Sequence, residues 1–377
     1  MPLEESEAEE DRVSGAGSKP EDAAGAAGTR LEARETTRAL GICFICGTLM
    51  ISATVAAIYF LGTFGNTRSF PAHPGNSGNA GSNGDLSRYP ADFLRDVVPI
   101  PCHSHNDYWR SEPLFSAIRA GCFGVEADVW HFDNDDDDEE DLLVGHDTAA
   151  LTANRTFRSL YVDPLVGVLT LMNPQTPFYH ETRRGVFDVD PEQTLVLLVD
   201  VKTDGAATWP RVLEQLEPLR SRGWLTRYED GVVTRGPVTV VGTGNTPFGL
   251  LTQNSTYRDA FFDAPLESLG EEDEGGTSTS RGRKSADDNY DHTNSFYAST
   301  SFRDVIGPVS RGALSEDQLR MIRGQISGAH RRGLKARYWE TPSWPVGTRN
   351  KLWRILVEEG ADILNVDDLY AASQSVW

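Results

Sequence analysis

Cysteine is scarce in this chain, which has four cysteines among 377 residues. Cys43 and Cys46 lie within one long apolar run, so Cys102 and Cys122 are the only cysteines in the rest of the sequence. This arrangement matches neither the cysteine framework of a disulfide-rich secreted domain nor the spacing of a zinc ribbon. The sequence therefore excludes a disulfide-rich secreted domain and a zinc ribbon.

Basic residues are also few, with 35 lysines and arginines against 56 aspartates and glutamates and a formal net charge of -21. Proteins that bind nucleic acids present basic stripes to the phosphate backbone, so this composition argues against a nucleic-acid partner. The acidic excess is concentrated in residues 4–11, 133–141 and 271–274, and such runs are typical of solvated tails and loops. Hydrophobic residues still make up 39% of the chain, which is enough for a folded core.

Charged residues are absent altogether from residues 39–64. A helix that crosses a bilayer needs about 20 apolar residues, so this run predicts a single membrane-spanning helix and not an ordinary signal peptide. Arg30, Arg34 and Arg38 precede the run, and the positive-inside rule then places the N-terminus in the cytosol. The bulk of the chain would lie in a lumen or outside the cell. The alternative is a buried apolar helix of a soluble protein.

Two N-x-S/T sequons agree with this orientation. They begin at Asn154 and Asn254, and each predicts a glycosylated surface loop. The catalytic domain of such a single-pass membrane protein would face away from the cytosol.

The composition divides the chain into four parts. Residues 1–38 read as a disordered acidic tail before the predicted transmembrane helix. Residues 65–85 are rich in Gly, Asn, Ser and Pro, which is typical of a flexible linker. A folded domain is expected over residues 86–377, interrupted by a disordered insertion at 270–289.

The domain alternates apolar strands with amphipathic helices, which indicates parallel βα units. Eight strands and a length near the roughly 250 residues of a TIM barrel predict a closed (β/α)8 barrel of the α/β class. Helices are expected at residues 113–120, 209–222, 316–331 and 346–359. The predicted strands are residues 97–102, 124–130, 194–202, 238–242, 260–264, 295–300, 334–339 and 362–366.

Cys102 falls at the end of the first predicted strand, and Cys122 falls just before the second. In parallel neighbouring strands these positions lie at opposite ends of the barrel. A disulfide needs a Cα separation of about 4.4 to 6.8 Å, so two free thiols are expected.

Polar side chains gather where three of the predicted strands end. Barrel enzymes place their catalytic residues at this C-terminal end of the strands. The residues are His103, His105 and Asn106 after the first strand, Glu126 and Asp128 on the second with His146 beyond it, and Asp200 and Lys202 on the third.

Glu126 and Asp128 share one strand face because side chains at positions i and i+2 point the same way. Asp200 and Lys202 share a face for the same reason. Burying three carboxylates is expensive unless a cation compensates them, and an all-oxygen set suits Mg²⁺ or Ca²⁺. Two histidines nearby can act as base or nucleophile and as acid, which phosphodiester cleavage requires.

The order His, Glu-x-Asp, His and a strand ending Asp-x-Lys resembles the phospholipase C-like phosphodiesterase superfamily. That group includes glycerophosphodiester phosphodiesterases and sphingomyelinase D enzymes. The segment HSHNDY and the predicted anchor are most similar to the fungal altered inheritance of mitochondria protein 6 family. The resemblance spans about residues 97–370 and includes RYWETP and ADILNVDDL.

The resemblance implies a metal-dependent phosphoric diester hydrolase that acts on a glycerophosphodiester or a (lyso)phospholipid. It makes Glu126, Asp128 and Asp200 the metal ligands and His146 one catalytic histidine. The second is His103 or His105, and this choice stays open.

Three further roles have alternatives. Lys202 can neutralise substrate phosphate or can be an ion-pair partner of Asp200. Asn106 is a candidate substrate-binding residue. The sequence lacks the Glu-Asn-Thr segment that supplies a ligand in ordinary glycerophosphodiesterases, and either Asn106 or Asp107 can compensate for it. Trp339 either lines the mouth as a substrate-binding residue or packs in the core.

Two rival functions fit parts of the pattern. His103 and His105 also resemble the first strand of a zinc amidohydrolase, but none of the later predicted strands carries the further histidines that such a site needs. The other rival is an inactive membrane-tethered barrel that serves as a binding module, since an intact ligand set indicates capacity and not turnover.

Overall fold

The structure, a computed structural model, describes residues 94–132, 141–178, 183–270, 289–310 and 312–374. The predicted tail, transmembrane helix and linker lie outside the described residues, as does nearly all of the predicted insertion. Within the described residues, no helix is both long enough and apolar enough to cross a membrane.

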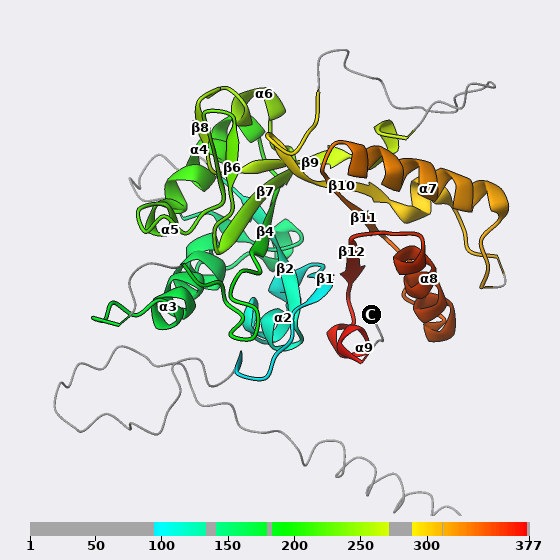
Figure 1. Cartoon of the computed structure of the whole chain (residues 1–377), viewed down its shortest axis with the longest axis horizontal. Coiled ribbons are helices and arrows are strands. Elements are labelled where there is room, and N and C mark those ends of the chain that lie inside the picture. Colours follow the sequence, from blue (N-terminus) through cyan, green and yellow to red (C-terminus); the bar gives the residue numbers. More distant parts are fainter. Residues whose placement is uncertain (1–93, 133–140, 179–182, 271–288, 311, 375–377) are drawn as a thin grey trace, which may run out of the picture. The chain divides into compact units, whose positions relative to one another are not determined.

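Eight parallel strands form a closed barrel (Figure 1). They follow the order β1-β12-β11-β10-β9-β7-β4-β2, and pairing between β1 and β2 closes the ring. The predicted (β/α)8 barrel and its eight strands are therefore confirmed. The strands are β1 (Ile100–Ser104), β2 (Cys122–Trp130), β4 (Leu195–Val201), β7 (Val238–Gly244), β9 (Phe261–Pro265), β10 (Ser295–Ser301), β11 (Lys335–Trp339) and β12 (Ile363–Val366).

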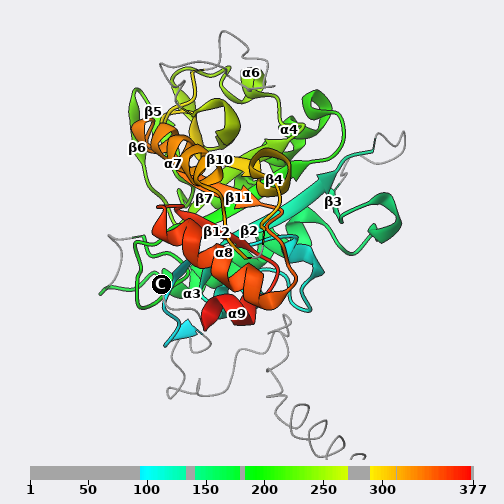
Figure 2. The same cartoon turned by 90° about the vertical axis from the view of Figure 1, so that its right-hand side faces the viewer.

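Helices cover the outside of the barrel, and Figure 2 shows α7 and α8 over the strands β10, β11 and β12. The four predicted helical regions are all occupied by helices. The Ser315 side chain caps α7 by accepting a hydrogen bond from the Gln318 amide, and the Gln318 side-chain oxygen accepts one from the Ser315 amide. The helices are α2 (Phe115–Arg119), α3 (Asp163–Met172), α4 (Gly205–Gln215), α5 (Glu217–Arg220), α6 (Phe248–Leu251), α7 (Glu316–Arg331), α8 (Val346–Glu358) and α9 (Leu369–Ser373).

Some elements were not anticipated. Helix α3 was missed, and so was β3 (Leu143–Val144), which pairs antiparallel with the end of β2. A separate three-stranded sheet is built from short segments outside the barrel. Its strands are β5 (Arg227–Glu229), β6 (Val232–Thr234) and β8 (Tyr257–Arg258).

Apolar side chains are buried on both faces of the barrel strands. Val125, Ala127 and Val129 of β2 are fully buried in the main hydrophobic core, together with apolar residues of the helices. A smaller apolar cluster that includes Val196 and Leu198 of β4 forms separately. Parallel barrel strands are covered on both sides, which is why β4 reads as a nearly continuous apolar run.

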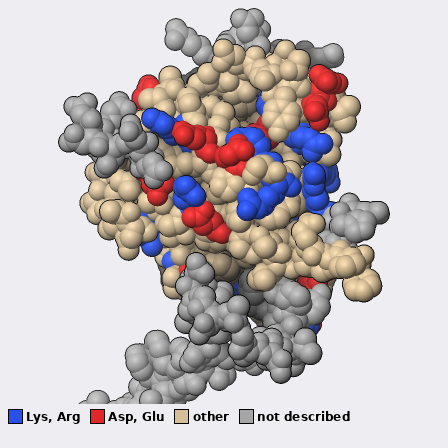
Figure 3. Space-filling model, turned by 90° about the vertical axis from the view of Figure 1, so that its left-hand side faces the viewer, with Lys and Arg blue, Asp and Glu red and all other residues tan. Residues whose placement is uncertain are grey.

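The surface mixes both signs of charge. Figure 3 shows acidic and basic side chains side by side on one face of the molecule. Ion pairs such as Arg211–Glu214 and Arg220–Glu217 connect neighbouring charges on α4 and α5. This face carries no broad basic stripe of the kind that binds nucleic acids.

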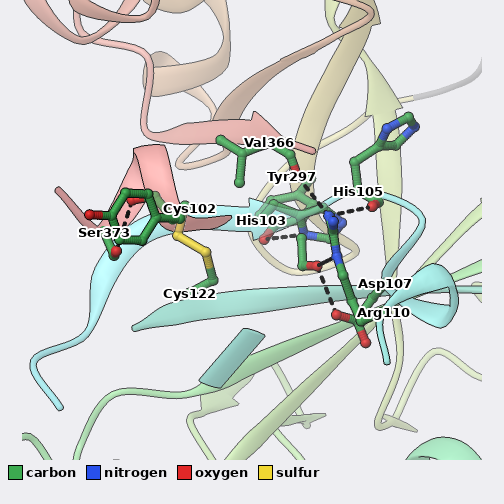
Figure 4. The surroundings of a disulfide bond; sticks show 11 residues. Cys102, His103, His105, Asp107, Arg110, Cys122, Tyr297, Val366 and Ser373 are labelled. Atoms are coloured by element: carbon green, nitrogen blue, oxygen red, sulfur yellow. Dashed lines mark hydrogen bonds between the residues drawn. A yellow bond between two sulfur atoms is a disulfide. The ribbon is translucent and has the colours of Figure 1, made fainter. Parts of the chain in front are cut away.

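The expectation of two free thiols is wrong, because Cys102 and Cys122 form a disulfide (Figure 4). Cys102 is the third residue of β1, and the strand begins three residues later than the sequence indicated. Ile100 lies opposite Cys122 and His103 lies opposite Gly124, so β1 uses three residue steps where β2 uses two. This bulge brings the two cysteines to the same end of the barrel with a Cα separation of 4.7 Å.

Replacing Cys102 and Cys122 with serine should lower the free energy of unfolding by about 3 kcal/mol, because the unfolded segment between them regains conformational freedom. Urea unfolding with and without reductant measures this loss. Reductant should bring the wild-type protein to the stability of the variant and leave the variant unchanged. Equal stability of the oxidised wild type and the variant would contradict the cross-link.

Candidate active site

Three carboxylates converge at the C-terminal end of β2 and β4. Asp128 lies directly opposite Asp200 in the register of the two strands, and Glu126 precedes Asp128 by one full strand repeat. Glu126, Asp128 and Asp200 each offer an oxygen within 4.8 Å of the others. The structure therefore brings together the three predicted metal ligands.

These carboxylates are held away from water. Glu126 and Asp128 are 6% and 1% exposed, and Oδ1 of Asp128 has no hydrogen-bond partner among the described residues. Burial raises the pKa of Asp128 well above its usual range, and the negative charge of Glu126 adds to this shift. An unsatisfied buried oxygen in an all-carboxylate cluster fits a hard divalent cation.

Lys202 follows β4 and contacts two of the three carboxylates. Its Nζ lies 2.6 Å from Oδ2 of Asp200 and 2.9 Å from Oδ2 of Asp128. Burial by itself would lower the pKa of this lysine, but the two carboxylates raise it above its usual value. Lys202 is therefore charged and paired, as the ion-pair alternative predicted.

His103 lies inside the barrel. It is fully buried, its Nε2 is 3.8 Å from Oε2 of Glu126, and its Nδ1 is 3.5 Å from the hydroxyl of Tyr297. Burial and the positive charge of Arg337 lower the pKa of His103 to about 4, so its ring is neutral at pH 7. The neutral ring packs beside Glu126 without a hydrogen bond to it, and Nε2 of His103 has no hydrogen-bond partner among the described residues.

His105 lies beyond the end of β1, on the side of His103 away from the disulfide (Figure 4). Its side chain is 24% exposed, and Nδ1 is 2.8 Å from Oδ1 of Asp367, which follows β12. Burial alone would lower the pKa of His105, but the hydrogen bond with Asp367 and the charge of Glu126 raise it. Arg110 secures the two segments by donating to the carbonyls of His105 and Asp367.

Tyr108 joins the first strand's loop to the rest of the site. Its hydroxyl is 2.7 Å from Oδ2 of Asp128, 2.7 Å from Oδ1 of Asn106 and 3.2 Å from Nδ1 of His146. Asn106 has a left-handed backbone, with φ of 47°, and its amide donates to Glu126 at 3.1 Å. Asn106 thus contacts the carboxylate cluster through its backbone.

His146 is the most accessible of the three site histidines. Its side chain is 50% exposed, and its Nδ1 is 3.8 Å from Oδ2 of Asp128. The ring packs against Trp109 with a centroid distance of 4.9 Å. The structure therefore places His146 beside the carboxylate cluster, as the sequence predicted.

Two glycines make room for site residues, and the sequence pattern did not single them out. A Cβ at Gly124 would overlap Nδ1 of His103. A Cβ at Gly244, where φ is 64°, would overlap Oδ1 of Asp200. Gly124 is buried on β2 and Gly244 is exposed at the end of β7, and at both positions a larger residue would meet the neighbouring site side chain.

The remaining predicted residues lie farther out. Trp339 is the last residue of β11 and is partly exposed. Asn154 and Asn254 are both exposed, as a glycosylation acceptor must be. In the second sequon Oδ1 of Asn254 accepts hydrogen bonds from the Thr256 and Tyr257 amides.

The chain is similar in sequence to known proteins. The family model described as "AIM6-like phosphodiesterase domain" matches residues 91–263. An "Altered inheritance of mitochondria protein 6 homolog" from Arthroderma benhamiae is 43% identical over 298 residues, covering 76% of this chain and 87% of the relative. "Altered inheritance of mitochondria protein 6" from Eremothecium gossypii is 36% identical, covering 75% of this chain and 72% of the relative. The Saccharomyces cerevisiae protein of that name is 35% identical, covering 76% and 73%.

Replacing Gly244 with alanine should weaken Mg²⁺ binding by about 10- to 100-fold, because the new Cβ displaces Asp200 from the carboxylate cluster. Isothermal titration calorimetry measures the affinity. Gly249→Ala is the matched control, since a Cβ there meets no atom within 4 Å. Equal Mg²⁺ affinity for the two variants would show that Asp200 is not a ligand.

Proposed function

The chain belongs to the altered inheritance of mitochondria protein 6 family, and we propose that it is a membrane-anchored, metal-dependent phosphoric diester hydrolase. The observation that carries this proposal is the convergence of three carboxylates, a lysine and accessible histidines at the C-terminal mouth of the barrel. Barrel enzymes carry their chemistry at this end of the strands.

Glu126, Asp128 and Asp200 would hold one Mg²⁺ or Ca²⁺ ion. Their oxygens are hard ligands, and the unpartnered oxygen of Asp128 is already stripped of water. When bound, the cation supplies Lewis-acid stabilisation of charge on the phosphoryl oxygens. Lys202 adds a positive charge at the same edge of the barrel and keeps Asp128 and Asp200 from repelling one another.

His105 and His146 are the groups that transfer protons. A general base or acid must reach the substrate, and both side chains are partly exposed, whereas His103 is enclosed. Asp367 accepts a hydrogen bond from Nδ1 of His105. The electron pair on Nε2 is then free to accept a proton from the attacking hydroxyl or to attack phosphorus itself. His146, beside Tyr108, then protonates the leaving oxygen.

His103 is assigned a positioning role. Its Nε2 faces Glu126 at 3.8 Å, and its ring is fixed between that carboxylate and Tyr297. It holds Glu126 in the cluster without touching the substrate. Of the two histidines of the HSHNDY segment, His105 is therefore the one proposed as catalytic.

A lumenal or extracellular location supports a lipid-related substrate. A disulfide between Cys102 and Cys122 is favoured in oxidising compartments, and both glycosylation sequons begin at exposed asparagines. Residues 39–64 would tether the domain to a bilayer, close to phospholipid headgroups. A glycerophosphodiester or (lyso)phospholipid is therefore the proposed substrate, with Asn106 and Trp339 contacting it.

The detergent-solubilised full chain should hydrolyse a member of a panel of glycerophosphodiesters, lysophospholipids and sphingomyelin, and EDTA should abolish turnover. Glu126→Gln should lower the rate by at least about 100-fold, because it removes a charged ligand from the cluster. Glu214→Gln, an exposed carboxylate on α4, is the control and should keep full activity. Turnover that survives EDTA, or none on any substrate from folded protein, would overturn the proposal, and the second result would favour an inactive binding module.

Substitutions of His103 and His105 should affect different constants, the Mg²⁺ affinity for His103 and kcat for His105. His105→Asn should lower kcat by about 10²- to 10⁴-fold with little change in Mg²⁺ affinity, because it removes a proton-transfer group. His103→Asn should chiefly weaken Mg²⁺ binding, since Glu126 loses its neighbour. Kinetics and calorimetry on both variants separate the roles, and the opposite pattern would make His103 catalytic.

A further inference from the structure

Two arginines are buried among the described residues, and they differ in their partners. Arg349 is 7% exposed and forms an ion pair with Asp368, with 2.8 Å between Nη1 and Oδ2. Arg337 is 3% exposed and forms no ion pair with any carboxylate in the described part of the chain. A buried charge is costly without a partner, so an unpaired buried guanidinium points to an anionic ligand.

Neutral groups hold the Arg337 guanidinium in place. Nε donates to Oγ of Ser299 at 3.0 Å, and Nη1 donates to Oδ1 of Asn365 at 3.1 Å. The guanidinium carbon lies 5.6 Å from the ring centre of Tyr297. The side chain is thus fixed in orientation, while Nη2 donates to no described residue and the guanidinium forms no ion pair with one.

The position of Arg337 relates it to the candidate active site. It lies on β11, and in the closed order of strands β11 is directly across the barrel from β4, which carries Asp200. Two of its neighbours also adjoin His103, because Asn365 is the register partner of His103 and the Tyr297 hydroxyl is 3.5 Å from Nδ1. An eight-stranded barrel is only wide enough for side chains or one small ligand, so Arg337 and the carboxylate cluster face one narrow interior.

The other cation of the site is already engaged. Lys202 is paired with Asp128 and Asp200 at 2.9 and 2.6 Å. Asp263 of β9 is also buried, and the charge of Arg337 opposes the rise that burial causes in the pKa of Asp263. The two residues form no ion pair, and Oδ1 of Asp263 has no hydrogen-bond partner among the described residues. Arg337 is therefore a buried cation that nearby carboxylates stabilise without direct contact in the described barrel.

We propose that Arg337 is a phosphate-binding residue, which receives a non-bridging oxygen of the phosphodiester from the side of the barrel opposite the carboxylate cluster. The planar guanidinium suits this task because it presents parallel donors to an oxyanion, whereas lysine acts as a point charge. This assignment deepens the proposed function and rests on it.

Binding of inorganic phosphate to the solubilised full chain in EDTA tests the assignment by isothermal titration calorimetry, independently of turnover. Arg337→Met should weaken phosphate binding by about 10- to 100-fold, the loss of one charge-assisted hydrogen bond, and Arg337→Lys should lie between the two. Arg349→Met is the matched control. It removes an equally buried arginine but should leave phosphate affinity unchanged.

The outcomes separate this inference from the proposed function. If Arg337→Met binds phosphate like the wild type, or if the wild type binds none, Arg337 is structural even where hydrolysis continues. If no substrate is hydrolysed yet phosphate affinity depends on Arg337, the inference stands and the proposed function fails.

If Arg337→Met does not fold, Ser299→Ala provides the test. This variant removes the hydrogen bond that holds Nε of Arg337, so it should weaken phosphate binding while the charge is kept. Unchanged affinity in both Ser299→Ala and Arg337→Lys would overturn the assignment.

Discussion

The burial of three carboxylates at one end of a barrel is the constraint on which the rest of the site depends. Removing such charges from water costs several kcal/mol for each ion unless other groups compensate. Lys202 neutralises part of this charge, and the amide of Asn106 and the hydroxyl of Tyr108 supply hydrogen bonds. One oxygen of Asp128 still has no partner among the described residues. The cluster therefore keeps an unsatisfied oxygen as protein alone, and the three carboxylates could hold a cation.

Several backbone features follow from that constraint. Asn106 adopts a left-handed conformation so that its amide points at Glu126. Gly124 and Gly244 leave space for His103 and Asp200, which an ordinary side chain would occupy. The left-handed residue after β1 and the glycines of β2 and β7 thus all lie next to site side chains, where strained or permissive backbone is common.

Sequence reasoning predicted what depends on local periodicity. The i, i+2 rule placed Glu126 and Asp128 on the interior face, and alternation of strands and helices predicted the barrel. The disulfide was missed because it depends on a bulge in β1, and a bulge has no clear signal in a single sequence. The partnership of His105 with Asp367 joins residues 262 positions apart, so no local pattern reveals it. The lack of an ion-pair partner for Arg337 among the described residues is likewise visible only once every neighbouring strand is in place.

The pairing of β1 with β12 has a consequence for biosynthesis. Strand β1 emerges early from the ribosome, but its neighbour β12 and Asp367 belong to the last segment of the chain. A nascent polypeptide therefore carries HSHNDY and both cysteines for most of translation without a closed sheet around them. Any product truncated before β12 would lack both the strand that seals the ring and the carboxylate that orients His105. The complete candidate site would therefore be assembled only in finished chains.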